Sequence, residues 1–241
     1  MVVFYGNELS LGITLAGWLF WVAMGSWGIG RFLVERIRHR LASFALGELL
    51  LALSLPLTIF AVRTIPATLR TSPGEIIGFF PMVYSSLAIL APACLTLGFL
   101  FVLGCRLYTP KSGEAAEQIG YVYVLEAIGA TSGGLLASLL LIRLFPSLYI
   151  MLGIGIFNLL VAFSLAWFLE NKRPFFLLST STLILVALLL FASGKVKDLH
   201  QASLNLQWRN YQLLTSRNSV YGNIAVTKRG DTYSFFNNGL Y

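Results

Sequence analysis

Long apolar stretches alternate with short polar breaks along the first 194 residues of the chain. The stretches lie at residues 9–30, 41–62, 76–104, 119–142, 148–169 and 175–192. About 20 apolar residues in a helix, each rising about 1.5 Å, cross the roughly 30 Å hydrocarbon core of a bilayer. The pattern therefore predicts an all-α polytopic membrane helix bundle of about six spans over residues 1–194.

The third stretch, residues 76–104, is long for a single span. One straight helix of this length would exceed the bilayer by about a third. Pro81 and Pro92 lie within it, and proline kinks or breaks a helix because it lacks an N–H and its ring clashes with the preceding turn. One tilted, broken span and a re-entrant segment followed by a span both remain open.

The pattern changes near Lys195, where a polar tail begins. The spacing of Leu199, Leu204 and Trp208 predicts a short interfacial helix followed by a linker, together covering residues 195–218. Apolar residues then alternate on either side of the turn signal at residues 228–231, which predicts a β-hairpin within residues 219–241. Because an isolated hairpin is marginally stable in water, we expect the tail beyond Ser216 to be mobile or to pair with another chain.

Composition and charge agree with a membrane protein. Hydrophobic residues make up 57% of the chain and charged residues 11%, against about 25% charged in soluble domains. The net charge of +7 does not indicate nucleic-acid binding, because the basic residues lie in short loops beside apolar stretches. The partner that composition implies is the lipid bilayer.

The same basic residues predict an orientation in the membrane. Loops 31–40, 106–118 and 170–174 carry eight Lys and Arg residues, whereas the opposite loops carry three. The positive-inside rule places the first set in the cytoplasm. Six spans then place the C-terminal tail on the other side.

Two glutamates, Glu48 and Glu126, lie inside predicted spans, and Arg31 lies at a span boundary. Ionisable groups inside a membrane face a cavity, a partner or the bundle interior. They predict either a proton-coupled or cation-binding pocket, or a structural pair such as Glu48 with Arg31. Glu8 is predicted to cap the first helix or to contact a ligand, and Asn158 to form an interhelical hydrogen bond or contact a ligand. We identify no catalytic residue and no metal-ligand set.

The tail contains the segments Ser219-Val-Tyr221-Gly222-Asn223-Ile224-Ala-Val226 and Phe235-Phe236-Asn237-Asn238-Gly239. These segments resemble the start of spermidine synthase-like proteins. The membrane part contains the segments Tyr5-Gly-Asn-Glu8, Gly25-Ser-x-Gly28, Ala91-Pro92-Ala-Cys-Leu and Tyr123-Val-Leu-Glu126-Ala-Ile-Gly129-Ala. In this order they resemble the multi-pass domain, similar to half of a major facilitator transporter, that is fused ahead of such synthases in bacteria, and this resemblance implies a bacterial inner membrane.

The resemblance implies a Rossmann-type aminopropyltransferase domain of polyamine biosynthesis, which uses decarboxylated S-adenosylmethionine. The nucleotide site of that domain would lie beyond Tyr241, so the resemblance implies no catalytic or cofactor residue in this chain. The chain would then be a fragment, or half of a split protein, and would be inactive alone. The sequence departs from the family at Gly222, where the family has Gln, and at Asn237-Asn238, where it has Leu-Asp.

Three functional hypotheses follow from these observations. In the first, the chain is the membrane domain of a spermidine synthase-like protein, which anchors and feeds a synthase-like domain located outside this chain. In the second, it is a transporter-like module for a small cationic or amphipathic solute that uses Glu48 and Glu126. In the third, it is a membrane anchoring or assembly subunit. Self-association into a homo-oligomer is left open.

Overall fold

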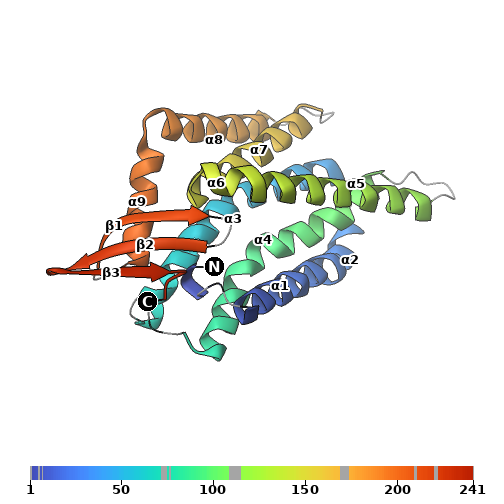
Figure 1. Cartoon of the computed structure of the whole chain (residues 1–241). Helices are drawn as coiled ribbons and strands as arrows, with labels where there is room; N and C mark the ends of the chain where they lie inside the picture. Colours follow the sequence, from blue (N-terminus) through green and yellow to red (C-terminus); the bar gives the residue numbers. More distant parts are fainter. Residues whose placement is uncertain are drawn as a thin grey trace.

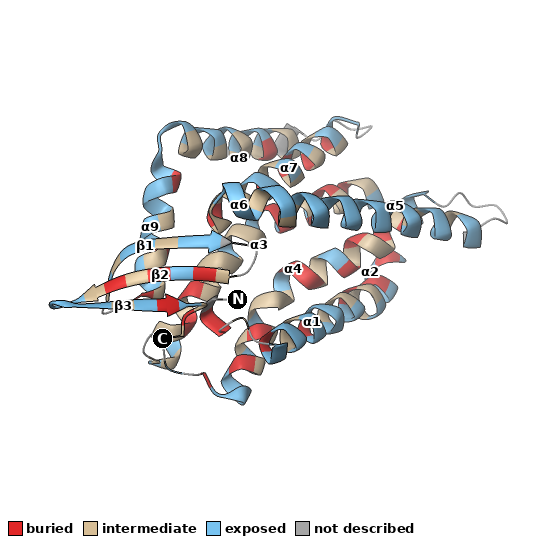
Figure 2. Ribbon diagram, in the orientation of Figure 1, coloured by how far each residue is buried: buried red, intermediate tan, exposed pale blue. Residues whose placement is uncertain are grey.

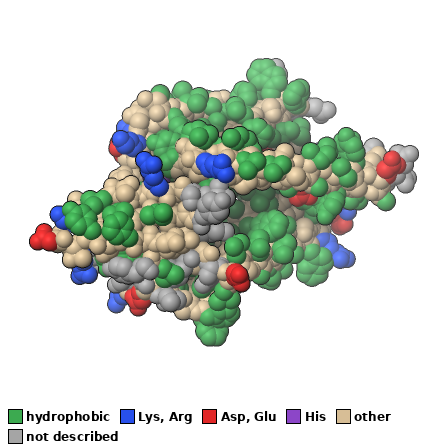
Figure 3. All heavy atoms as spheres, viewed as in Figure 1, with side chains coloured by type: hydrophobic (Ala, Val, Ile, Leu, Met, Phe, Trp, Pro, Cys, Tyr) green, Lys and Arg blue, Asp and Glu red, His purple; other side chains and the backbone are tan. Residues whose placement is uncertain are grey.

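The chain forms a helix bundle that carries a small β-sheet at one end (Figure 1). The computed structural model describes residues 2–4, 6, 8–71, 75, 77–108, 115–168, 174–208, 211–219 and 222–240. The sheet and both ends of the chain lie at the same end of the bundle (Figure 1). Hydrophobic side chains cover most of the helical part in Figure 3, and charged side chains lie toward its two ends.

Five helical segments in the described part of the chain are long and apolar enough to cross a membrane. The first combines α1 (Glu8–Ala23), the π-helix η2 (Met24–Gly30) and α2 (Arg31–Val34), and the next two are α3 (Arg40–Leu69) and α4 (Phe79–Tyr108). The fourth combines α5 (Ala115–Leu136), the π-helix η3 (Ala137–Leu141) and α6 (Ile142–Leu144), and the fifth is α7 (Ser147–Trp167). The predicted helix bundle is confirmed, with several segments long and apolar enough to span a membrane.

The sixth predicted span corresponds to α8 (Pro174–Ala192), which is followed by α9 (Lys195–Gln207). The two helices together are apolar enough for a further span, but they are bent by 83° at the break between them. Gly194 makes this bend with a φ of +72°, a left-handed conformation that glycine adopts without steric cost. The described chain therefore has five candidate spans, or six if α8 and α9 count as one.

Residues of the third apolar stretch form one continuous helix, α4, rather than a re-entrant segment and a span. Pro81 lies in its first turn, where the backbone N–H groups have no intrahelical partner, so its missing N–H costs little. Pro92 lies inside the helix without ending it, and the Thr96 hydroxyl donates to the Pro92 carbonyl at 2.7 Å. Of the two alternatives, the structure thus forms a single long helix.

Helices α1 and α4 approach each other at glycines. A Cβ atom at Gly98 of α4 would collide with the Val22 carbonyl of α1, and one at Gly25 of η2 would collide with the Leu95 carbonyl of α4. Small residues let membrane helices pack with their backbones in contact. On its other side α4 packs on α3, which packs on α7, and α8 covers α7.

Helix α5 lies at the edge of the bundle and is exposed along its length (Figure 2). It packs mainly on α4, and none of its residues from 116 to 136 is buried. A Cβ atom placed on Gly129, Gly133 or Gly134 would meet nothing within 4 Å. The glycine face of α5 therefore has no partner in the described part of the chain.

The sheet has three antiparallel strands in the order β1-β2-β3. They are β1 (Gln212–Ser219), β2 (Gly222–Arg229) and β3 (Thr232–Asn237). The predicted hairpin of β2 and β3 is present, but the predicted linker to residue 218 is wrong, because most of its second half is β1. The expectation that the tail beyond Ser216 is mobile or pairs with another chain stays a prediction, although β1 supplies a third strand beside the hairpin. The sequence pattern does not predict β1, because it is a polar edge strand of which only Leu213 packs against the small core of the sheet.

Gly222 and Asn238, two departures from the synthase-like pattern, are in direct contact. Gly222 has a φ of +152°, and a Cβ atom there would lie 2.6 Å from Oδ1 of Asn238. The same Oδ1 accepts a hydrogen bond from the backbone N–H of Asn223 at 2.8 Å, and the Asn238 N–H donates to the Asn223 carbonyl at 2.8 Å. A side chain at position 222 would therefore displace the asparagine that joins β2 to β3.

Candidate functional site

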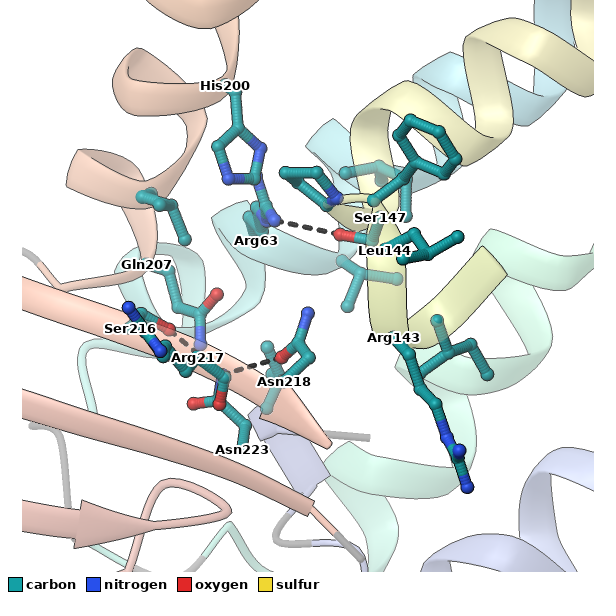
Figure 4. Close-up of a pocket in the computed structure, with 17 residues that line it drawn as sticks. Arg63, Arg143, Leu144, Ser147, His200, Gln207, Ser216, Arg217, Asn218 and Asn223 are labelled. Atoms are coloured by element: carbon teal, nitrogen blue, oxygen red, sulfur yellow. Dashed lines mark hydrogen bonds between the residues drawn. The ribbon is translucent and has the colours of Figure 1, made fainter. Parts of the chain in front are cut away.

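A cavity of about 580 Å³ lies where the helix bundle meets the sheet. Its walls come from α3, the connection between α6 and α7, α9, and strands β1 and β2 (Figure 4). We call this cavity the junction pocket. Its polar lining consists of Arg63, Arg143, Ser147, His200, Gln207, Ser216, Arg217, Asn218 and Asn223. Ligand pockets commonly measure about 300–1,000 Å³, so the junction pocket has the size of a small-molecule site.

Arg63 of α3 is the central polar residue of the junction pocket. Only 7% of its surface is exposed. Its Nη1 donates to the Ser203 hydroxyl of α9 and lies 3.5 Å from Nδ1 of His200, while its Nη2 donates to the Ser147 hydroxyl of α7 at 3.0 Å. One guanidinium therefore joins three helices at the end of the bundle that carries the sheet.

Local backbone features bring these partners together. Helix α3 continues past Arg63 to Leu69 and ends at Arg70, whose φ of +55° closes the helix in the left-handed conformation. Pro146 precedes α7, so Ser147 is the first residue of that helix. The bend at Gly194 turns α9 so that it packs on α3, and the i, i+3 spacing of His200 and Ser203 puts both on one face of α9.

His200 is a neutral partner of Arg63. Burial, and secondly the positive charge of Arg63, lower the pKa of His200 from its usual 6.5 to about 4. The imidazole is therefore uncharged at neutral pH, and a neutral Nδ1 facing the guanidinium acts as the hydrogen-bond acceptor. The Tyr149 ring stands edge-on to the imidazole with centroids 6.2 Å apart.

This lowered pKa predicts a stability loss in mild acid. Unfolded chains protonate a histidine near pH 6.5, but the folded chain resists protonation of His200 until about pH 4. Protons therefore favour the unfolded state between these values, and the thermal midpoint in detergent should fall as the pH drops from 6.5 toward 4. In His200→Asn, which keeps an acceptor but does not titrate, the fall should be smaller. Identical pH profiles for both proteins would contradict the lowered pKa.

The remaining arginines lie at the rim of the junction pocket. Arg143 of α6 and Arg217 of β1 are both exposed, and the Arg143 side chain extends away from Arg63 (Figure 4). Asp and Glu do not occur among the described residues that line this pocket. The pocket therefore carries three formal positive charges without a carboxylate to balance them.

The sheet wall of the pocket is held by Asn223. Its Nδ2 donates to the Ser216 hydroxyl at 2.9 Å and to Oδ1 of Asn218 at 2.6 Å, with a longer contact of 3.3 Å to the Arg217 carbonyl. Asn223 is itself buried. These bonds fix the polar residues of β1 and β2 against one another before any ligand binds.

The five residues singled out from the sequence lie apart from the junction pocket. Glu48 is half-buried in α3, Arg31 is exposed at the start of α2, and no ion pair between them is found within the described residues. Glu126 is exposed on α5, although it is close enough to act electrostatically on the Cys105 thiol of α4. Neither glutamate lines the junction pocket or a second cavity of about 100 Å³ between α1, α3 and α4.

Glu8 and Asn158 occupy separate positions as well. Glu8 is exposed in the first turn of α1, where its charge faces the positive end of the helix dipole. Asn158 is half-buried in α7, and its side chain makes no hydrogen bond to any described residue. Groups of three or more His, Cys, Asp or Glu side chains placed to hold a metal ion are absent from the described ranges.

The main residue that sequence reasoning missed is Arg63. It follows directly on the predicted end of the second stretch, where it counts as one of the three basic residues in the loops opposite the cytoplasmic set. Its partners Ser147 and Ser203 are common residues with no distinctive spacing to it. One available signal was the i, i+3 pair His200 and Ser203 on the predicted interfacial helix.

Comparisons with protein-family models, with curated proteins and with solved structures gave no match to this chain.

Proposed function

We propose that the chain is the membrane-embedded domain of a spermidine synthase-like protein, and that its helix bundle anchors a soluble domain beginning with the three-stranded sheet. The observation that carries this proposal is the continuous series of contacts between the sheet and the bundle. The sequence resemblance of the β2–β3 segment supplies the identity of the soluble domain, and the helix bundle supplies the anchor.

The connection runs through a continuous series of buried contacts. The Phe236 ring of β3 packs edge-on against Trp208 with centroids 4.9 Å apart, and both side chains are buried. The Trp208 backbone N–H donates to the Leu204 carbonyl at 2.9 Å and so continues from the end of α9. Ser203, on that helix, accepts from Arg63 of α3. Such a series would hold the sheet in one orientation relative to the bundle, as an anchor requires.

The chemistry of the sites favours anchoring over transport of a cationic solute. The junction pocket is lined by arginines, which repel a polyamine. Glu48 and Glu126 neither line this pocket nor contact each other within the described part of the chain. The amine-binding and adenosyl-binding groups would accordingly belong to the soluble domain rather than to the bundle.

Deleting this protein from the cell that makes it provides the test. Detergent-solubilised membranes would be assayed for transfer of an aminopropyl group from labelled decarboxylated S-adenosylmethionine to putrescine. We expect the membrane-bound activity to disappear in the deletion strain and to return when the complete gene is supplied. Solubilised membranes make the result independent of the side on which the sheet lies.

Two neighbouring phenylalanines provide matched complementation variants for this test. Phe236→Ala removes the ring contact to Trp208. The soluble domain should then lose its packing against the bundle, and the membrane-bound transferase activity should not return. Phe235 is 67% exposed on the other face of β3, so Phe235→Ala should restore activity fully. Membrane-bound transferase activity that persists in the deletion strain would refute the proposal.

A further inference from the structure

Positive charge gathers around the junction pocket without a counter-charge. Arginines from α3, α6 and β1 line it, and the described lining holds no carboxylate. Like charges around one cavity repel each other at a cost that rises as water is excluded. A bound anion would relieve this repulsion, and concave sites of one charge sign attract ions of the opposite sign.

The clearest indication of an anion is the environment of Arg63. Its guanidinium is buried, yet its partners Ser147, Ser203 and His200 are all uncharged. Neutral acceptors satisfy N–H groups but do not balance the charge, and a buried charge is costly unless it is paired. A guanidinium has five N–H donors, and these contacts use both on Nη1 and one on Nη2. Nε–H and the second Nη2–H therefore have no partner among the described residues.

Phosphate is the oxyanion that fits these features best. An arginine binds phosphate through two parallel N–H donors, and Arg63 has two donors unused on adjacent nitrogens. Three arginines suit a doubly charged group better than a single carboxylate. The cavity volume of about 580 Å³ also leaves room for an organic part beside the phosphate.

We propose that the junction pocket binds a phosphate-bearing ligand, with Arg63 as the buried contact and Arg143 and Arg217 as mobile contacts at the rim. The phosphate comes either from a lipid headgroup of the surrounding bilayer or from a soluble molecule. This proposal does not depend on the anchoring function, because it rests on the charges and hydrogen bonds of the pocket alone.

The test measures the thermal midpoint of the full chain, purified in a non-ionic detergent, with two kinds of probe. Pyrophosphate represents a soluble ligand, with sodium chloride at the same ionic strength as its control. Dioctanoyl phosphatidylglycerol represents a headgroup, with dioctanoylglycerol as its control. A ligand at about 100 times its Kd should raise the midpoint by about 5 °C or more. A shift with pyrophosphate alone identifies a soluble source, and a shift with the lipid alone identifies a headgroup.

Arginine variants decide whether the shift arises at this pocket. Arg143→Gln and Arg217→Gln change exposed residues, so the chain should fold, and each should weaken apparent affinity about tenfold. Arg63→Met should abolish the shift. Arg38→Gln changes an exposed arginine between α2 and α3 that does not line the pocket, so this variant is the matched control and should leave affinity unchanged.

Three results would overturn the proposal. The first is a midpoint that neither probe raises above its control. The second is a loss of affinity in Arg38→Gln as large as in Arg143→Gln and Arg217→Gln. The third is an Arg63→Met protein that still binds the probe with wild-type affinity. Should Arg63→Met fail to fold, the two exposed variants decide the outcome.

Discussion

Gly98→Leu is expected to separate α1 from α4 and to destabilise the bundle by about 3 kcal/mol or more, since overpacking a closely packed core costs 1–3 kcal/mol and sometimes more. The reason is that even a Cβ atom at this position collides with the Val22 carbonyl, which belongs to the backbone of α1 and cannot rotate away. Reversible unfolding in mixed micelles, or the thermal midpoint in detergent, would measure the loss.

Gly129→Leu is the matched control for Gly98→Leu. Gly129 also lies within a membrane helix, but a Cβ atom there meets nothing within 4 Å. Replacing glycine by leucine in a helix interior improves helix propensity by up to about 1 kcal/mol, so this variant should be neutral or slightly stabilised. Equal midpoints for the two variants would show that α1 and α4 are not in backbone contact.

Phe236→Ala is expected to unfold the sheet while leaving the bundle intact. Phe236 is 1% exposed and packs with Trp208 and Ala225 in the small core of the sheet. Truncating a buried phenylalanine costs about 3–5 kcal/mol, which is large for a sheet of three short strands. Amide hydrogen exchange should show β2 and β3 losing protection while α3 and α4 keep theirs.

Phe235→Ala tests whether this effect comes from burial rather than from the aromatic residue itself. Phe235 precedes Phe236 in β3, and its side chain is 67% exposed on the opposite face. Exposed substitutions usually change stability by no more than about 0.5 kcal/mol. Strand protection should therefore match that of the wild-type chain. Loss of protection in both variants would mean that the two faces of β3 are assigned the wrong way round.

The spans could be predicted because membrane helices carry an unambiguous signal. Each needs a long apolar run, and every one of the six apolar stretches coincides with a helix. The sequence signal for the turn at residues 228–231 is equally clear. Its glycine, Gly230, adopts a φ of +61° between the two strands of the hairpin, a conformation that glycine favours. In these segments the local pattern and the fold agree.

Arg63 and β1 could not be predicted because their roles depend on distant partners. Arg63 acquires its environment only when α9 packs on α3. Its partner His200 on α9 lies 137 residues further along the chain. The strand β1 is defined by pairing with β2, and its polar sequence has no period-2 pattern of its own. The orientation inferred from the basic loops remains a prediction. Two of these loops do lie close together, because the Arg40 guanidinium donates to the Arg106 carbonyl at 3.1 Å.

The 83° bend at Gly194 also sets how far the sheet can reach. If α8 crosses the bilayer near its normal, α9 runs almost parallel to the membrane surface. The sheet is then joined at that surface to α9 through the contact between Trp208 and Phe236. The sheet would then keep the same face toward the lipid rather than turn freely. Amphipathic molecules diffusing in the membrane plane would thus meet it by a two-dimensional search.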